Sequence, residues 1–157
     1  NVMNELVYRN LSEDEKRQIC AWKYGGEYDL YNLPSYEEMQ VRQIGFMNPQ
    51  REKNYYGFWD ESILVGFVNI LEEKEEVFIG IGVNPDLCNK HYGQRMLLIT
   101  YEISKKLYPN KPLYLEVRTW NIRAVKCYQK AGFRIDGQAY ELTTGIGTGT
   151  FYRMIRE

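Results

Sequence analysis

Residues 90–96 combine positive charge, a glycine and the expected start of a helix, an arrangement that can bind phosphate. The first turn of a helix exposes backbone N–H groups at the positive end of its dipole, and Gly93 has no Cβ to keep an anion away. Lys90 and Arg95 add charge beside it. A single glycine is weak evidence, because most such loops only turn the chain. The candidate contacts are Lys90, His91, Tyr92, Gly93, Gln94, Arg95 and Met96.

The strand expected before this loop, Val77 to Val83, carries Gly80 and Gly82. Glycine weakens a strand and often marks a bulge or the close approach of a ligand to the backbone. The backbone of this strand is therefore a place where an extended ligand could bind. Such a strand beside an anion-binding loop suits a nucleotide with a long, amide-bearing arm.

Aromatic residues crowd the segment before residue 37, and two interpretations are open. They can form a wall for a substrate amine or for the end of a peptide, or they can cover the edge of the core. For the first interpretation the candidate substrate-binding residues are Trp22, Tyr24, Tyr28 and Tyr31.

Apolar periodicity, caps and breakers predict the elements that must position these residues. Ser12 and Glu15 form a capping-box pattern, Ser35 precedes a second short helix with Met39, Val41 and Ile44 as its apolar residues, and Asn121 is a typical N-cap. The expected strands are 5–10, 54–59, 63–71, 77–83, 113–118, 133–142 and 150–155, and the expected longer helices are 13–22, 93–108 and 122–131. The glycine-rich residues 144–149 precede a strand, so we interpret them as a flexible connection and not as a dinucleotide fingerprint.

Composition and charge narrow the classes of function. The 157 residues carry a formal net charge of −1, so no basic field indicates a nucleic-acid partner. No apolar run has membrane-spanning length and no signal-peptide pattern opens the sequence, so we expect a cytoplasmic protein without a membrane partner. Scattered cysteines and a single histidine argue against a metal site. We expect one domain over residues 3–157, with Asn1 and Val2 interpreted as a cloning remnant.

The segment Leu113–Phe133, LYLEVRTWNIRAVKCYQKAGF, resembles the acetyl-CoA-dependent N-acetyltransferases of the GNAT superfamily. Members of that family commonly read a strand, Asn, two residues, Ala, three residues, Tyr, three residues and Gly-Phe. The matching positions in this chain are Asn121, Ala124, Tyr128, Gly132 and Phe133.

The upstream loop carries the second signature of that family, which is Arg or Gln, two residues, Gly, one residue, and Gly or Ala. Lys90, Gly93 and Arg95 hold these positions, and Arg95 departs from the small residue that is usual there. The resemblance runs from about Ile63 to Phe133. Within the superfamily the segment is also similar to the ribosomal-protein N-terminal alanine acetyltransferases.

The resemblance implies an α+β fold, a three-layer α/β arrangement. Its sheet would be mixed, mostly antiparallel and twisted, with about seven strands and about four helices, and splayed between strands 4 and 5. Acetyl-CoA would be the cosubstrate, with its pantetheine arm between strands 77–83 and 113–118. The arm would contact the backbone of Ile81, Gly82 and Val83. The acceptor would be the amine of a small molecule or of a peptide, and the protein would be a monomer or a homodimer without a metal.

The chemistry implied is direct transfer of an acetyl group to an amine. Tyr128 is the candidate general acid for the departing thiolate, since an unperturbed phenol has a pKa of about 10; otherwise it is a tyrosine packed on the sheet. Glu116 matches the general base of the alanine acetyltransferases; otherwise it is a salt-bridge partner, for instance of Arg118. Glu76 and a water chain are competitors for that role. Asn121 is a candidate cofactor contact as well as a cap.

Three other side chains lie among the residues of the Asn121–Phe133 signature. Cys127 lies one step round the helix from the candidate acid, which disfavours a thiol nucleophile. Lys126 and Arg123 can contact the 3′-phosphate of coenzyme A or remain solvated. The departure at Arg95 keeps an alternative function open, that of an acyl-CoA-binding sensor or partner module with little or no catalysis.

Overall fold

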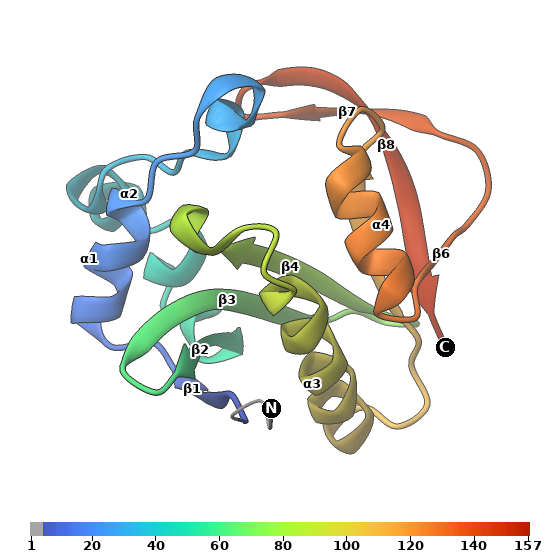
Figure 1. Cartoon of the computed structure of the whole chain (residues 1–157), viewed down its shortest axis with the longest axis horizontal. Coiled ribbons are helices and arrows are strands. Elements are labelled where there is room, and N and C mark those ends of the chain that lie inside the picture. The colour runs from blue at the N-terminus through green and yellow to red at the C-terminus, as the bar shows by residue number, and fades with distance from the viewer. Residues whose placement is uncertain (1–4) are drawn as a thin grey trace. The chain divides into compact units, whose positions relative to one another are not determined.

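The computed structural model describes residues 5–157, and Asn1 and Val2, interpreted above as a cloning remnant, lie outside them. The chain forms two compact units, residues up to 69 with 81–92, and residues 70–80 with 93–157. Within the described residues the α-helices are α1 (Glu13–Ala21), α2 (Tyr36–Arg42), α3 (Tyr92–Leu107) and α4 (Ile122–Lys130). The strands are β1 (Val7–Asn10), β2 (Tyr55–Asp60), β3 (Ile63–Glu72), β4 (Val77–Val83), β5 (Leu113–Arg118), β6 (Arg134–Ile135), β7 (Tyr140–Thr144) and β8 (Gly147–Arg156) (Figure 1).

Hydrogen-bonded strands follow the order β1-β2-β3-β4-β5-β8-β6, and β7 pairs with β8. β4 and β5 are parallel, whereas the β1–β2, β2–β3, β5–β8, β6–β8 and β7–β8 pairs are antiparallel. The resemblance therefore implied the correct class, a mixed and mostly antiparallel sheet. The described residues form eight strands where about seven were expected.

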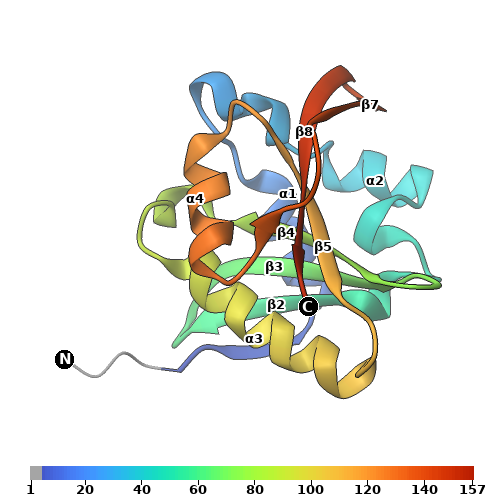
Figure 2. The ribbon, with the colours of Figure 1, turned by 90° about the vertical axis from the view of Figure 1, so that its right-hand side faces the viewer.

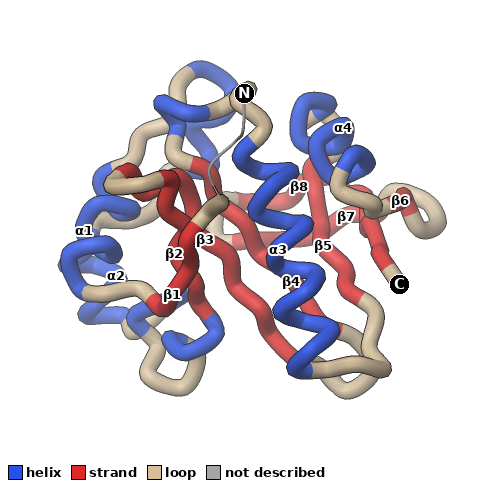
Figure 3. Tube along the Cα trace, turned by 60° about the horizontal axis from the view of Figure 1, so that its bottom comes forward, coloured by secondary structure: helices blue, strands red, loops and turns tan. Residues whose placement is uncertain are grey.

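In the first unit, β1, β2 and β3 lie side by side, and α1 and α2 lie next to these strands (Figure 3). A register shift between Phe58 and Trp59 interrupts the β2–β3 ladder. Apolar side chains from the helices and strands form one buried cluster. Its members are Ile19, Cys20, Tyr36, Met39, Phe46, Trp59 and Leu64.

Local signals fix both helices of this unit. Ser12 and Glu15 form the expected capping box, with Ser12 N–H donating to Glu15 Oε1 at 2.8 Å. Ser35 caps α2 by accepting from Glu38 N–H at 3.1 Å. Met39 is buried as predicted, but the assignment of Val41 to the apolar face is wrong, because Val41 is 83% exposed.

The second unit is built on β8, whose two halves pair with different neighbours (Figure 2). Residues from Phe151 to Arg156 pair with β5, and residues from Gly147 to Phe151 pair with β7. Along β5 the side chains alternate, so Leu113, Leu115 and Val117 are buried while the three intervening residues are half-buried. Fully buried residues of this unit also include Val77, Ile79, Met96, Leu97, Ala131 and Met154.

One predicted strand and one predicted loop of this unit are wrong. Residues 133–142 were expected to form a single strand, but Gly137, with a φ of 76°, separates β6 from β7. Residues 144–149 were expected to be a flexible connection, yet β8 begins at Gly147 and Gly149 pairs with Leu142. The turn of the β7–β8 hairpin is therefore shorter than the glycine-rich sequence suggested.

The two helices of the second unit begin and end close to their predicted bounds. α3 starts at Tyr92, one residue before the expected Gly93. Asn121 caps α4, and Gly132 follows that helix with a φ of 96°, which favours glycine. Among the described helices, none is both long enough and apolar enough to cross a bilayer.

Candidate active site

The strand residue Gly82 makes room for a side chain of its own unit. A Cβ added to Gly82 would lie 2.4 Å from Phe67 Cε1 and 2.8 Å from Phe67 Cζ. The Phe67 ring in turn packs against Phe46, Tyr55 and Trp22, with centroid separations of 6.1, 6.3 and 6.3 Å. The close approach that the glycine predicted is therefore made, on this face, by an aromatic ring.

The neighbouring backbone carbonyl of Val83 also has a partner within the first unit. The Tyr24 hydroxyl donates to Val83 O at 2.6 Å, and burial raises the pKa of this phenol. Tyr24 also packs edge-to-face on Tyr31, with ring centroids 6.5 Å apart. Tyr24 was predicted to bind substrate, and the structure shows it bonded to the end of β4. The backbone of that end, Ile81–Val83, was predicted to bind the cofactor.

The remaining aromatic residues of this segment divide between the two interpretations left open by the sequence. Trp22 packs against the buried cluster, and Tyr36 belongs to that cluster. Tyr28 and Tyr31 are half-buried on a 3₁₀ turn, Gly26–Tyr31. Trp22 and Tyr36 therefore cover core, while Tyr28 and Tyr31 retain exposed ring surface.

The predicted phosphate loop is tightly folded. Asn84 N–H donates to Val65 O at 2.9 Å, and the Asn84 side chain accepts from Asp86 N–H at 3.0 Å. Asn89 and His91 have left-handed φ values of 65° and 67° on either side of the exposed Lys90. Left-handed residues occur in backbone turns that gather N–H groups into anion-binding concavities. The contact between this loop and a phosphate stays a prediction.

Asp60, which the sequence did not single out, anchors the start of α3. The Tyr92 hydroxyl donates to Asp60 Oδ2 at 2.5 Å, and Asp60 is the last residue of β2. Tyr92 is the first residue of α3. Because 32 residues separate the partners, no local pattern could have indicated the contact.

The first turn of α3 was predicted to contact the cofactor, and its residues differ in exposure. Gly93 is buried, and Gln94 and Arg95 are half-buried. Met96 is buried as a whole residue, at 0% exposure, so neither its side chain nor its backbone is open to a ligand in this structure. The absence of a Cβ at Gly93 is compatible with an anion close to the backbone at this helix start.

In the second unit, β4 and β5 are paired over a short stretch. Their ladder joins Val77 to Leu113 and Phe78 to Tyr114. In the described ladder of this unit, neither Ile79 nor Gly80 has a partner on β5. On β4, the backbone groups of Ile79 and Gly80 are therefore not bonded to β5. The two strands are paired at one end only, as expected for strands that splay apart.

Glu116, the candidate base, lies on β5 and accepts a hydrogen bond from the Tyr140 hydroxyl at 2.7 Å. Burial, and secondly the bond to Glu116, raise the pKa of Tyr140. The salt bridge proposed between Glu116 and Arg118 is wrong, since no described residue forms an ion pair with Glu116. The Arg118 guanidinium lies over the Phe151 ring instead, 4.7 Å from its centroid.

Glu76, the competing candidate base, is bound to a cation. Arg153 donates to both of its oxygens, with Nη1 3.0 Å from Oε2, and to Asp136 Oδ2 at 3.1 Å. These carboxylates raise the pKa of Arg153. Arg153 pairs in register with Glu116 on β5, so the arginine across from Glu116 is already occupied.

α4 carries the signature that begins at Asn121. The buried Asn121 side chain accepts from Ala124 N–H at 3.2 Å, which makes it the predicted cap. Tyr128 is half-buried on this helix. Burial raises the pKa of the Cys127 thiol and so keeps the thiol protonated. A protonated thiol is a poor nucleophile, which agrees with the prediction that Cys127 does not act as one. Arg123 and Lys126 are exposed.

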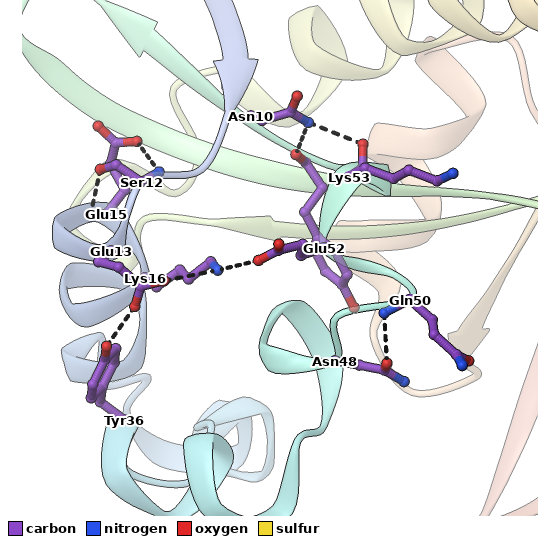
Figure 4. Close-up of polar contacts among 11 residues, drawn as sticks. Asn10, Ser12, Glu13, Glu15, Lys16, Tyr36, Asn48, Gln50, Glu52 and Lys53 are labelled. Carbon is purple, nitrogen blue, oxygen red and sulfur yellow. Dashed lines mark hydrogen bonds and ion pairs between the residues drawn. The ribbon is translucent and has the colours of Figure 1, made fainter.

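A cavity of about 400 Å³ lies in the first unit beside the N-terminus of α1 (Figure 4). At its wall the buried Lys16 Nζ lies 3.2 Å from Glu13 Oε1 and 3.0 Å from Glu52 Oε2. The Asn10 amide donates to the carbonyls of Lys53 and Tyr55. These polar groups contact one another and hold α1 to the segment before β2.

One comparison with known proteins identifies a family. The model of the acetyltransferase (GNAT) family matches residues 9–133, which includes both signatures. The search of curated proteins gives no match. Within the described residues, no group of histidine, cysteine and carboxylate side chains is arranged to hold a metal ion.

Solved structures share the fold at low identity. A spermidine N-acetyltransferase SpeG chimera from Vibrio cholerae and hSSAT is 19% identical, with a TM-score of 0.73 over 98% of this chain and 95% of that chain. An acetyltransferase (GNAT family) from Bacillus anthracis is 16% identical, with a TM-score of 0.79 over 98% and 95%. AAC(6')-Ib in complex with paromomycin and acetyl-CoA is 17% identical, with a TM-score of 0.74 over 98% and 93%.

Proposed function

The chain belongs to the acetyltransferase (GNAT) family, and from this premise we propose that it transfers an acetyl group from acetyl-CoA directly to an amine. The acceptor is a small molecule or the N-terminus of a peptide. The similar structures include a spermidine N-acetyltransferase and a protein bound to paromomycin, and both spermidine and paromomycin carry several amino groups. Residues 3–157 act as one catalytic domain, because the family match runs through both units.

The donor is recognised mainly by backbone groups. The turn around Lys90 and the first residues of α3 bind the diphosphate through N–H groups, and Lys90 adds charge. Ile81, Gly82 and Val83 offer backbone groups to the amide-bearing arm. Gln94, Arg95 and Asn121 complete the predicted contacts.

Two side chains handle the protons of the reaction. Glu116 takes a proton from the acceptor ammonium, so that the nitrogen lone pair can attack the thioester carbonyl. The C–N bond forms, the C–S bond breaks, and Tyr128 gives its proton to the departing thiolate. The carboxylate of Glu116 suits this role because it is half-buried and no described cation neutralises it.

The observation that carries the proposal is the family match over both signatures, and a thiol-release assay tests it. Acetyl-CoA is incubated with spermidine, paromomycin or a short peptide with a free N-terminus, and free coenzyme A is measured. With the best acceptor, Glu116→Gln and Tyr128→Phe should each lower kcat by about 100-fold or more. Matched controls are Glu141→Gln, an exposed glutamate on β7, and Tyr101→Phe, a tyrosine on α3, which should keep parental turnover.

The same proteins separate catalysis from binding. Acetyl-CoA at about 100 times its Kd should stabilise the folded chain by about 2.7 kcal/mol. Stabilisation without thiol release on any amine would favour the alternative of an acyl-CoA-binding module. Full turnover by Tyr128→Phe or by Glu116→Gln would remove that residue from the mechanism.

A further inference from the structure

Tyr140 reaches Glu116 across an intervening strand. Both β5 and β7 pair with β8, and Phe151 of β8 is in register with Arg118 on one side and with Tyr140 on the other. Because neighbouring strands lie about 4.8 Å apart, β7 and β5 are separated by about 10 Å at this point. The 2.7 Å contact between the Tyr140 hydroxyl and Glu116 Oε2 therefore uses the full length of the phenol.

The surroundings leave Tyr140 as the group that orients Glu116. Arg153, in register with Glu116, is bound to Glu76 and Asp136. The Arg118 guanidinium rests on an aromatic ring. A carboxylate with one oxygen held by a neutral donor keeps its charge and its second oxygen for an incoming ammonium.

The phenol is a dependable donor over the working range of pH. Burial and the neighbouring carboxylate raise the pKa of Tyr140, so its hydroxyl stays protonated at neutral and mildly alkaline pH. It can therefore donate to Glu116 but cannot compete with it as a base.

We infer that Tyr140 is a positioning residue that fixes the carboxylate of Glu116 for proton transfer from the acceptor amine. The inference rests on the proposed function, in which Glu116 is the base. Tyr140 acts through Glu116 and does not itself exchange a proton with substrate.

The chain provides a matched control on the same strand. The Tyr114 hydroxyl donates to Glu73 Oε1 at 2.8 Å, a phenol–carboxylate bond of nearly the same length two residues away from Glu116. Burial also raises the pKa of Tyr114. Tyr114→Phe removes an equivalent bond without touching Glu116.

The kinetic test measures kcat and KM in a double-mutant cycle of Tyr140→Phe and Glu116→Gln, with the best acceptor of the panel. Tyr140→Phe should lower kcat by about 10-fold and leave the KM for acetyl-CoA unchanged, because a misplaced base slows only the chemical step. In the Glu116→Gln background it should change kcat by less than about twofold. Tyr114→Phe should keep the parental kcat. Independent effects in the cycle, or an equal loss in Tyr114→Phe, would overturn the inference.

A second measurement needs no substrate and distinguishes the two proposals. The phenol of Tyr140 is titrated by fluorine NMR after 3-fluorotyrosine labelling, with Tyr140→Phe used to assign its signal. Glu116→Gln should lower the pKa of Tyr140 towards the ordinary range, since one cause of its elevation is gone. An unchanged titration would refute the contact and with it the positioning role. Full turnover by Glu116→Gln together with a shifted titration would instead refute the assignment of Glu116 as the base. The contact with Tyr140 would then be real, but it would have no role in proton transfer.

Discussion

Replacing Gly82 by alanine tests whether this glycine serves the packing of Phe67. The new Cβ would meet the Phe67 ring at 2.4 Å, whereas carbon atoms in favourable contact lie about 3.5 Å apart. The ring must therefore move by about 1 Å, against the Phe46, Tyr55 and Trp22 rings that surround it. Overpacking of this kind costs about 1–3 kcal/mol, and the lower entropy of the unfolded chain returns about 0.5 kcal/mol. We expect a net loss of about 1–2 kcal/mol.

Urea denaturation of Gly82→Ala, Phe67→Leu and the double variant measures this coupling. With leucine at position 67 the added methyl group has space, so Gly82→Ala should become neutral or slightly stabilising. Gly25→Ala is the matched control, because a Cβ at Gly25 meets no atom within 4 Å. If Gly82→Ala costs no more than Gly25→Ala, or if Phe67→Leu does not relieve it, the packing explanation is wrong.

The same variants show whether Gly82 also serves the donor. Acetyl-CoA binding is measured by thermal shift for Phe67→Leu and for the double variant, which should have similar stability. Equal stabilisation by acetyl-CoA would assign Gly82 to packing alone. Weaker stabilisation of the double variant would show that the ligand also approaches the strand there.

Two further predictions concern the first unit. Lys16→Ala should lower the free energy of unfolding, measured in urea, by about 2 kcal/mol, because it removes a buried cation shared by Glu13 and Glu52. Lys16→Met should lower it by less, because methionine keeps the aliphatic part of the side chain packed. Equal losses for the two variants would show that the charge dominates. Between about pH 9 and pH 11 the parent should lose about 1 kcal/mol more stability than Tyr24→Phe. Burial raises the folded pKa of Tyr24, so its stabilisation is complete below the unfolded pKa of about 10 and is lost as the pH rises towards the folded value. Urea denaturation at each pH measures this, and equal losses would contradict it.

The elements that the sequence predicted well are those with local signals. The bounds of β4 and β5 follow from a proline after one strand and from clean alternation in the other. The caps Ser12 and Asn121 lie within three residues of the backbone groups they satisfy. Both family signatures are also local, so the family could be identified from them.

The parts that the sequence missed depend on contacts between distant residues. Tyr140 is 24 positions from Glu116, and Tyr24 is 59 positions from Val83. Neither contact is predicted by the periodicity of apolar residues or by a capping pattern in the sequence. The glycine-rich residues 144–149 misled the prediction for the opposite reason, because glycine composition suggested a loop while pairing with β7 extends β8 through them.

The arrangement around Arg153 explains why two carboxylates of the second unit are suited to different tasks. Taking a proton onto Glu76 would break a bidentate, charge-assisted pair with Arg153, the stronger kind of hydrogen bond. Taking a proton onto Glu116 disturbs no ion pair with a described residue, and the Tyr140 hydroxyl can remain bound to the other oxygen. Arg153 therefore holds Glu76 as part of the framework and, because it is already paired, leaves Glu116 as the carboxylate that we propose as the base.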